Sequence, residues 1–226
     1  MKFILACSAL ALAAPAAIPT RELAGVTVID TPLVRAAEAY ALDHSSWPVY
    51  KHIMRSWLYG VLMIQADKSL SCSVDLEVHA IAAILHDLGW DQTPNSTLIS
   101  PDRRFEVDGA VAARKFISSH EDGSDWEERR VQLVWDSIAL HAEPSIANYK
   151  ELDVQVVAKG IGLDFTGPAY GISEEDYALV GQEYPKDDLI PAANQTLIWL
   201  CQTKPAATYG RVTSSLVYPK SSMLTF

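Results

Sequence analysis

A short apolar run of the sequence ends in two neighbouring residues that bind metals in many proteins. In "AAILHDLGW", residues 82–90, four apolar residues lead directly into His86 and Asp87. A histidine is favourable at the negative end of a helix dipole, whereas an aspartate there is not. Imidazole nitrogens and carboxylate oxygens are ordinary ligands of divalent metals. The pair is therefore either a helix end or one part of a metal site whose other ligands come from elsewhere in the chain.

Two residues far away in the sequence are candidates for those other ligands. His52 lies among apolar residues in the middle of a helix expected over residues 48–67, where a lone histidine is usually a hydrogen-bonded core residue. Asp164 follows Gly162 in "AKGIGLDFTG", where an aspartate is more often a turn or cap residue. Each of the two residues alone has an ordinary structural explanation.

The hydrophobic pattern predicts that helices position these residues. Apolar residues recur at three-to-four spacing over residues 48–67, and Pro48 lies in the first turn of that segment. Gly89 is placed to end a helix over residues 74–88. Long alternating patterns typical of strands are missing, so the expected fold is an all-α domain. The other helices are expected over residues 32–43, 105–119, 123–141, 150–160, 174–183 and 187–203, with a loop over 93–102.

The composition restricts the kind of partner. The chain has 226 residues, of which 49% are hydrophobic, and this is enough for one globular domain. With 28 acidic and 18 basic residues, the formal net charge is -10. A surface with this balance argues against binding to nucleic acid or to an anionic membrane, because both are bound by dense Lys and Arg. A small neutral substrate suits the charge better.

The N-terminus is typical of a secretory signal peptide. Residues 1–17, "MKFILACSALALAAPAA", combine Lys2, an apolar stretch and the small-x-small pattern Ala14-Pro15-Ala16. An ordinary N-terminal helix is the alternative. We therefore expect entry into the secretory pathway and secretion, and no membrane span once the leader is removed. The globular domain is expected over residues 30–204, and a loosely ordered tail over 205–226.

Other features agree with a secretory route without establishing it. The sequons Asn95-Ser96-Thr97 and Asn194-Gln195-Thr196 predict a glycoprotein. After removal of the leader, Cys72 and Cys201 remain. They form a disulfide only if the fold brings them close enough, and the sequence leaves both outcomes open.

Taken together, the four candidate ligands resemble the pattern of the HD-domain superfamily of metal-dependent enzymes. The matching segments are "VYKHIMRSWLYG", "AAILHDLGW" and "VVAKGIGLDFTG". Proteins of this superfamily are helical bundles in which a histidine, a His-Asp pair and a distant aspartate converge on a metal. The resemblance implies that the metal ligands here are His52, His86, Asp87 and Asp164.

Two further segments are similar to the fungal cyanamide hydratase branch of that superfamily. They are "RFEVDGAVAARKFI" (104–117) and "VWDSIALHAEPSIA" (134–147), and the similarity extends over roughly residues 45–185. Two-metal members usually have a histidine four residues before the Gly-Ala pair, where this chain has Phe105. The resemblance therefore implies a single metal site, with Zn²⁺ as the expected ion and Fe²⁺ or Mn²⁺ as alternatives.

The activity implied by the resemblance is metal-assisted hydration of a small nitrile-like substrate, as in the conversion of cyanamide to urea. The metal would lower the pKa of a bound water to roughly 7. His141 is expected to shuttle protons, because the unperturbed pKa of histidine lies near neutrality. Glu106 either orients a ligand or pairs with a nearby arginine. For Arg55, a structural ion pair is favoured over a catalytic role.

Three other functions remain open. An HD-type phosphohydrolase needs a basic cluster beside the metal, which Arg55, Arg103 and Arg104 are available to form. A related lyase or hydrolase step in fungal secondary metabolism would favour a larger, more aromatic pocket. A secreted interaction protein on an inactive HD scaffold would be indicated by loss of a ligand, and all four ligands are present. The sequence also leaves a homo-oligomer open.

Overall fold

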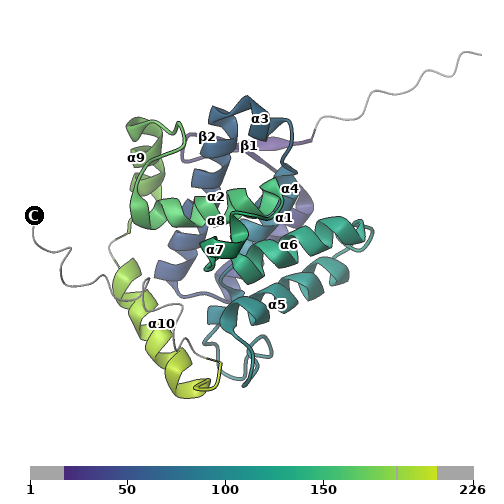
Figure 1. Cartoon of the computed structure of the whole chain (residues 1–226), viewed down its shortest axis with the longest axis vertical. Helices are drawn as coiled ribbons and strands as arrows, with labels where there is room; N and C mark the ends of the chain where they lie inside the picture. The colour runs from purple at the N-terminus through teal and green to yellow at the C-terminus, as the bar shows by residue number, and fades with distance from the viewer. Residues whose placement is uncertain (1–17, 187, 208–226) are drawn as a thin grey trace, which may run out of the picture.

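The protein is a mostly helical bundle preceded by a small hairpin (Figure 1). The computed structural model describes residues 18–186 and 188–207. The predicted signal peptide (1–17) lies outside the described residues. Of the tail predicted over 205–226, residues 208–226 also lie outside them. The expectation of a helical bundle is confirmed, and the hairpin is an addition to it.

The hairpin consists of two short antiparallel strands, β1 (Thr20–Leu23) and β2 (Val26–Ile29). The two turn residues between them, Ala24 and Gly25, both have positive φ, 49 and 75, as a two-residue hairpin turn often requires. Strands of four residues are too short to produce the alternating pattern by which a sequence reveals a sheet. That is why the hairpin was not expected.

Most helices agree with the sequence prediction, although the short helices over 68–71 and 144–147 were not expected and the helix predicted over 74–88 covers only 76–85. The α6 helix begins at Glu128 rather than at residue 123, and the α8 helix continues six residues beyond its predicted end at residue 160. The bounds are α1 Pro32–Asp43, α2 Trp47–Ala66, α3 Lys68–Ser71, α4 Leu76–Leu85, η1 Leu88–Trp90, α5 Phe105–Ser119, α6 Glu128–Leu140, α7 Pro144–Ala147, α8 Leu152–Thr166, α9 Glu174–Glu183 and α10 Leu189–Thr203.

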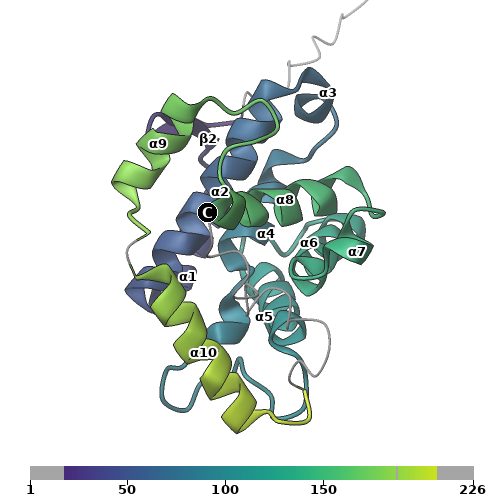
Figure 2. The ribbon, with the colours of Figure 1, turned by 60° about the vertical axis from the view of Figure 1, so that its left-hand side comes forward.

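The longest helix, α2, is central to the arrangement of the others. It packs against α4 and α8, while α9 and α10 contact it at its two ends (Figure 2). The α5 and α6 helices form a neighbouring pair that closes over α4. Because α2, α4, α6 and α8 all meet in the interior, polar residues at matching heights on these four helices are brought together.

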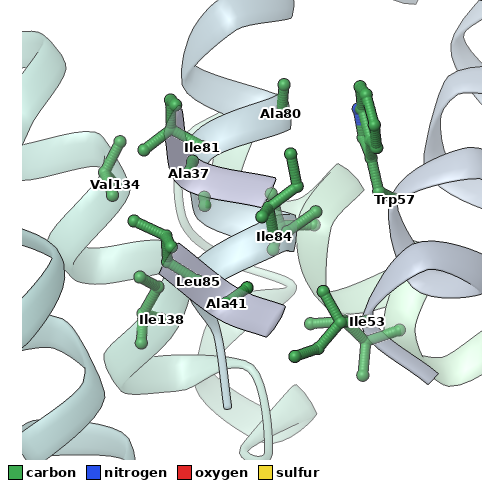
Figure 3. Packing of buried hydrophobic residues seen from close by; sticks show 14 of the residues in the cluster. Ala37, Ala41, Ile53, Trp57, Ala80, Ile81, Ile84, Leu85, Val134 and Ile138 are labelled. Carbon is green, nitrogen blue, oxygen red and sulfur yellow. The ribbon is translucent and has the colours of Figure 1, made fainter. Parts of the chain in front are cut away.

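The core surrounds α4 on every side. Ile81, Ile84 and Leu85 of this helix are fully buried and lie between Ile53 of α2 and Ile138 of α6 (Figure 3). A helix that is apolar all round must be enclosed by other elements, and α4 fulfils this expectation. Its burial fixes the place where the helix ends, which is at the His86-Asp87 pair.

Glycines allow α2 and α8 to cross closely. A Cβ atom on Gly160 of α8 would lie 2.9 Å from the backbone oxygen of Ser56 and 3.0 Å from the Cα of Gly60, both in α2. The sequence prediction ended the helix at residue 160, beside the glycines Gly160 and Gly162. In the structure the helix continues through both, and Gly160 serves packing rather than termination.

The N-terminal end of α4 is tied to two other helices. The Asp75 carboxylate accepts hydrogen bonds from the backbone of Glu77 and Val78, and Arg130 of α6 donates to it at 2.7 Å. The backbone N–H of Asp75 in turn donates to Asp153 of α8 at 2.9 Å. Burial alone would raise the pKa of Asp75, but Arg130 and the capping bonds outweigh it and lower the pKa.

Two earlier expectations, about a disulfide and about membrane spans, can be compared with the described residues. Cys72 and Cys201 are both exposed and free, so the disulfide left open by the sequence is not formed. None of the described helices is long and apolar enough to cross a membrane.

We predict that Gly160→Ala destabilises the fold by about 1–3 kcal/mol, because its methyl group must displace the backbone of α2. Gly162→Ala is the matched control in the same helix, since a Cβ there meets nothing within 4 Å. It should be neutral or stabilise by up to about 1 kcal/mol. Urea unfolding measures both, and equal effects of the two substitutions would contradict the close crossing.

We also predict that Asp75→Ala lowers the free energy of unfolding by about 1 kcal/mol at pH 7, through loss of the cap and of the partly exposed ion pair. The folded-state pKa of Asp75 is lowered, so its ionic contribution is present above the unfolded pKa of about 3.9 and is lost as the pH falls through the folded pKa. Urea unfolding at pH 7 and at pH 3 should show the difference between wild type and variant shrinking in acid. A constant difference would contradict the ionic part.

Candidate metal centre

Three of the predicted ligands meet in the interior of the bundle. His52 comes from the middle of α2, and His86 and Asp87 follow the last turn of α4. The Nε2 atom of His86 lies 3.2 Å from Nε2 of His52 and 3.2 Å from Oδ2 of Asp87. Each residue offers one ligand atom, and the three atoms lie within 4.8 Å of one another. All three residues are buried, with at most 2% of their surface exposed.

The hydrogen bonds on the far sides of the two imidazoles determine which atoms face this point. Nδ1 of His86 donates to the backbone oxygen of Ala83 at 2.8 Å, and Nδ1 of His52 donates to Asp164 at 2.7 Å. Both Nε2 atoms are therefore left with lone pairs. The third atom, Oδ2 of Asp87, is buried without a hydrogen-bond partner among the described residues. Three lone pairs facing one another in a buried space favour a positive charge between them. Burial would lower the pKa of His86, but the Asp87 carboxylate outweighs it and raises the pKa.

The donor set fits a divalent metal. Two imidazole nitrogens and one carboxylate oxygen are suitable ligands for Zn²⁺, Fe²⁺ and Mn²⁺. Burial alone would raise the pKa of Asp87, but His86, followed by His52 and His141, outweighs burial and lowers the pKa to about 2. The carboxylate is therefore ionised at neutral pH and available to a metal.

Asp164, the predicted fourth ligand, contacts His52 but does not belong to the group formed by His52, His86 and Asp87. It sits inside α8, where it accepts hydrogen bonds from Arg55 Nε at 2.7 Å and from His52. It is not one of the three residues whose ligand atoms come within 4.8 Å of one another. Arg55 has no exposed side-chain surface and forms the structural ion pair that was favoured for it. Burial would raise the pKa of Asp164, but His52 and Arg55 lower it well below its usual range.

His141 faces the group from the end of α6. Its Nδ1 donates to the backbone oxygen of Ile138 at 2.7 Å, so its Nε2 carries a lone pair, 3.9 Å from Oδ1 of Asp87. Burial is the largest cause that lowers the pKa of His141 to about 4, and a positive charge on the neighbouring His86 would act in the same direction. The expectation of a pKa near neutrality is therefore corrected. The ring is neutral at pH 7 and presents a proton acceptor to the site.

Aromatic rings lie beside the cluster. Phe105 is 4% exposed, and its ring centre lies 5.5 Å from that of His141. The ring of Phe165 lies 5.2 Å from that of His52. Glu106 forms an ion pair with Arg104, which is one of the two roles left open for it.

One residue of this neighbourhood was missed by the sequence analysis. Lys186, between α9 and α10, places its Nζ 3.1 Å from Oδ1 of Asp164. Its surroundings in the sequence, "EYPKDDL", show no periodicity or motif that points to the centre. Only the path of the folded chain could have revealed the contact.

Comparison with known protein families agrees with this geometry. The HD domain matches the chain over residues 49–179, more than half of its length, and the match includes all the predicted ligands. The chain belongs to the HD-domain family. With its buried His/Asp cluster, this HD-domain protein is a metal-dependent enzyme of the hydrolase type. A comparison with curated proteins finds no match.

We predict that Asp87→Asn weakens metal binding by more than about 100-fold, because it removes the ionised ligand; loss of residues that merely orient ligands costs 10–100-fold. Metal content after dialysis, measured by atomic emission, checks this. Asp136→Asn is the control, since this aspartate pairs with Lys150 at 2.8 Å, away from the cluster. Retention of one tightly bound ion per chain by Asp87→Asn would show that the metal sits elsewhere.

Proposed function

We propose that this HD-domain protein is a metal-dependent hydratase that adds water to a small, neutral, nitrile-like substrate, in a reaction of the cyanamide-to-urea type. The observation that carries the proposal is the charge around the cluster. The three arginines considered as a phosphate clamp are paired with acids, and the neutral imidazole of His141 and the ring of Phe105 lie beside the cluster.

The pairing of the arginines favours hydration over phosphohydrolysis. Arg55 is bound to Asp164, Arg103 lies 3.0 Å from Asp108, and Arg104 is paired with Glu106. A phosphate ester needs cationic donors with hydrogen-bonding capacity to spare. An ester would have to compete with these carboxylates for each guanidinium, whereas a neutral substrate needs none of them. The formal net charge of -10 also disfavours binding of an anionic phosphate ester.

The residues in and beside the cluster have different roles in the proposed reaction. His52, His86 and Asp87 would hold the ion, which when bound supplies Lewis-acid activation of water and of the substrate carbon. His141, with its Nε2 lone pair directed at the site, accepts a proton from the attacking water and returns one to the substrate nitrogen. The net reaction adds one water across the carbon–nitrogen triple bond. Phe105, which is buried beside His141, provides an apolar contact that would limit the access of other waters to the reacting atoms.

Segments similar to the cyanamide hydratase branch support this substrate class over its relatives. "RFEVDGAVAARKFI" begins α5 with Phe105, and "VWDSIALHAEPSIA" ends α6 with His141, so both similar segments supply residues beside the cluster. A related lyase or hydrolase step in fungal secondary metabolism is the second candidate. An inactive interaction protein is disfavoured, because a buried, unpartnered carboxylate oxygen is costly without a function.

We further propose that the protein acts in the secretory pathway. The pattern of residues 1–17 supports this, as do the two sequons, whose Asn95 and Asn194 are exposed in the structure.

The test is urea release from cyanamide by Zn²⁺-loaded protein, run beside hydrolysis of a phosphate monoester. We expect urea formation, and we expect His141→Gln to lower kcat by roughly 10²–10⁴-fold while metal content is unchanged, because it removes the proton acceptor. His86→Ala should lose both metal and activity. Turnover of the phosphate ester without urea formation would reverse the assignment.

A further inference from the structure

We propose that the cavity between the α1–α2 turn, η1 and α10 is a second binding site, which takes a small neutral molecule that carries several hydroxyl groups, such as a sugar or a polyol. The cavity has a volume of about 350 Å³. None of the three residues of the metal group lines it. The site is therefore distinct from the metal centre, and it does not depend on the proposed reaction.

Segments that are distant in the sequence form the walls of this cavity. The turn between α1 and α2 supplies Ser45 and Ser46, and the end of η1 supplies Trp90. The α10 helix, which packs against α2, closes the other side with Ala192 and Gln195 (Figure 2). Sites for small molecules have volumes of about 300–1,000 Å³. This cavity is at the lower end of that range, so a single sugar ring suits it better than a larger ligand.

Polar groups without partners indicate a ligand that forms hydrogen bonds. The Ser45 hydroxyl and the indole N–H of Trp90 are both buried without a hydrogen-bond partner among the described residues. Ser46, the residue before α2, makes no capping hydrogen bond with its side chain. Buried polar groups are seldom unsatisfied in folded proteins. Because side-chain rotamers often change on binding, a polar ligand in the cavity is placed to supply the missing partners.

The charged groups at the cavity favour a neutral ligand. The side chain of Asp91 is fully buried, and its Oδ2 lies 3.0 Å from Nδ1 of His44. The same carboxylate accepts hydrogen bonds from the backbone N–H of Thr93, at 2.9 Å, and from the Ser96 hydroxyl. Among the described residues that line the cavity there is no lysine or arginine. An anion would therefore meet a carboxylate with no free cation to offset it, and a cation would find that carboxylate enclosed.

The lining also offers the two kinds of surface that a sugar presents. Val49 of α2, Trp90 and Ala192 supply carbon atoms, whereas the serines and the amide of Gln195 supply hydrogen-bonding groups. A sugar ring carries C–H groups on its faces and hydroxyl groups around its edge. A site that combines apolar surface with a few polar groups can therefore hold both parts at once.

Trp90 is shared by the surroundings of the cavity and those of the metal group. Its backbone N–H donates to the backbone oxygen of Asp87 at 2.8 Å. The ring centre of Phe105 lies 5.5 Å from that of Trp90 and 5.5 Å from that of His141. A molecule in the cavity is thus a neighbour of the metal centre rather than a ligand of the metal, and the Trp90 ring is a suitable reporter of its presence.

Fluorine NMR of protein labelled with 5-fluorotryptophan tests the proposal, with glucose and myo-inositol as neutral probes. The Trp90 resonance is identified by its absence from Trp90→Phe. We expect at least one neutral probe to shift this resonance saturably, with a dissociation constant in the millimolar range, as befits a ligand of few atoms. The resonance of Trp126, which lines a different cavity, should not move. Glucuronate, which adds a carboxylate to the glucose ring, should bind at least about 10-fold more weakly than glucose.

Variants of α10 make the result specific. Ala192→Leu fills part of the cavity and should weaken binding of the neutral probes by more than about 10-fold. Gln195→Ala removes one hydrogen-bonding group and should weaken it by about 3–10-fold. Gln202→Ala is the matched control, because this glutamine is also exposed on α10 but does not line the cavity. Far-UV circular dichroism verifies folding, and the exposed Gln195 decides the outcome if Ala192→Leu does not fold.

The proposal is overturned if neither glucose nor myo-inositol shifts the Trp90 resonance saturably, or if glucuronate binds as tightly as glucose. It is also overturned if Gln195→Ala binds the neutral probes as tightly as Gln202→Ala. The titrations are run with metal-free and with Zn²⁺-loaded protein, and neither needs turnover. Absence of urea formation from cyanamide would therefore overturn the proposed function and leave this second site standing.

Discussion

The metal centre depends on the close contact between the backbones of α2 and α8. Gly160 packs against Ser56 and Gly60 at distances that leave no room for a side chain. This contact brings α8 near enough for Asp164 to reach both His52 and Arg55, which lie one helical turn apart on α2. A wider separation of the two helices would break the carboxylate contact that orients His52.

Local patterns were sufficient to predict most of the helices and the His86-Asp87 corner. The all-round apolar character of α4 and the glycine after its end both belong to one short segment of the sequence. They can therefore be recognised without knowing the fold. The convergence of His52 on that corner came from the resemblance to the HD pattern. Spacing within a sequence does not reveal which helices cross, and a resemblance supplies that information from other members of a family.

The features that the sequence did not reveal all depend on contacts between distant segments. Gly160 looks like a helix breaker until α2 is placed beside it, and Lys186 looks like an ordinary loop residue until its segment reaches Asp164. The pKa of His141 likewise follows from burial near His86 rather than from residue type. Sequence reasoning therefore identified the chemical groups of the centre, whereas their protonation and division of labour required coordinates.

The buried oxygen of Asp87 links the abundance of the folded protein to the supply of metal. Without a cation, the folded chain encloses this oxygen opposite two imidazole lone pairs, whereas water solvates all three groups when the chain is unfolded. An ion that binds only the folded form adds about 2.7 kcal/mol of stability at a concentration one hundred times its Kd. A chelator would therefore act on this protein as a mild denaturant, and metal starvation would reduce the amount of protein as well as its activity.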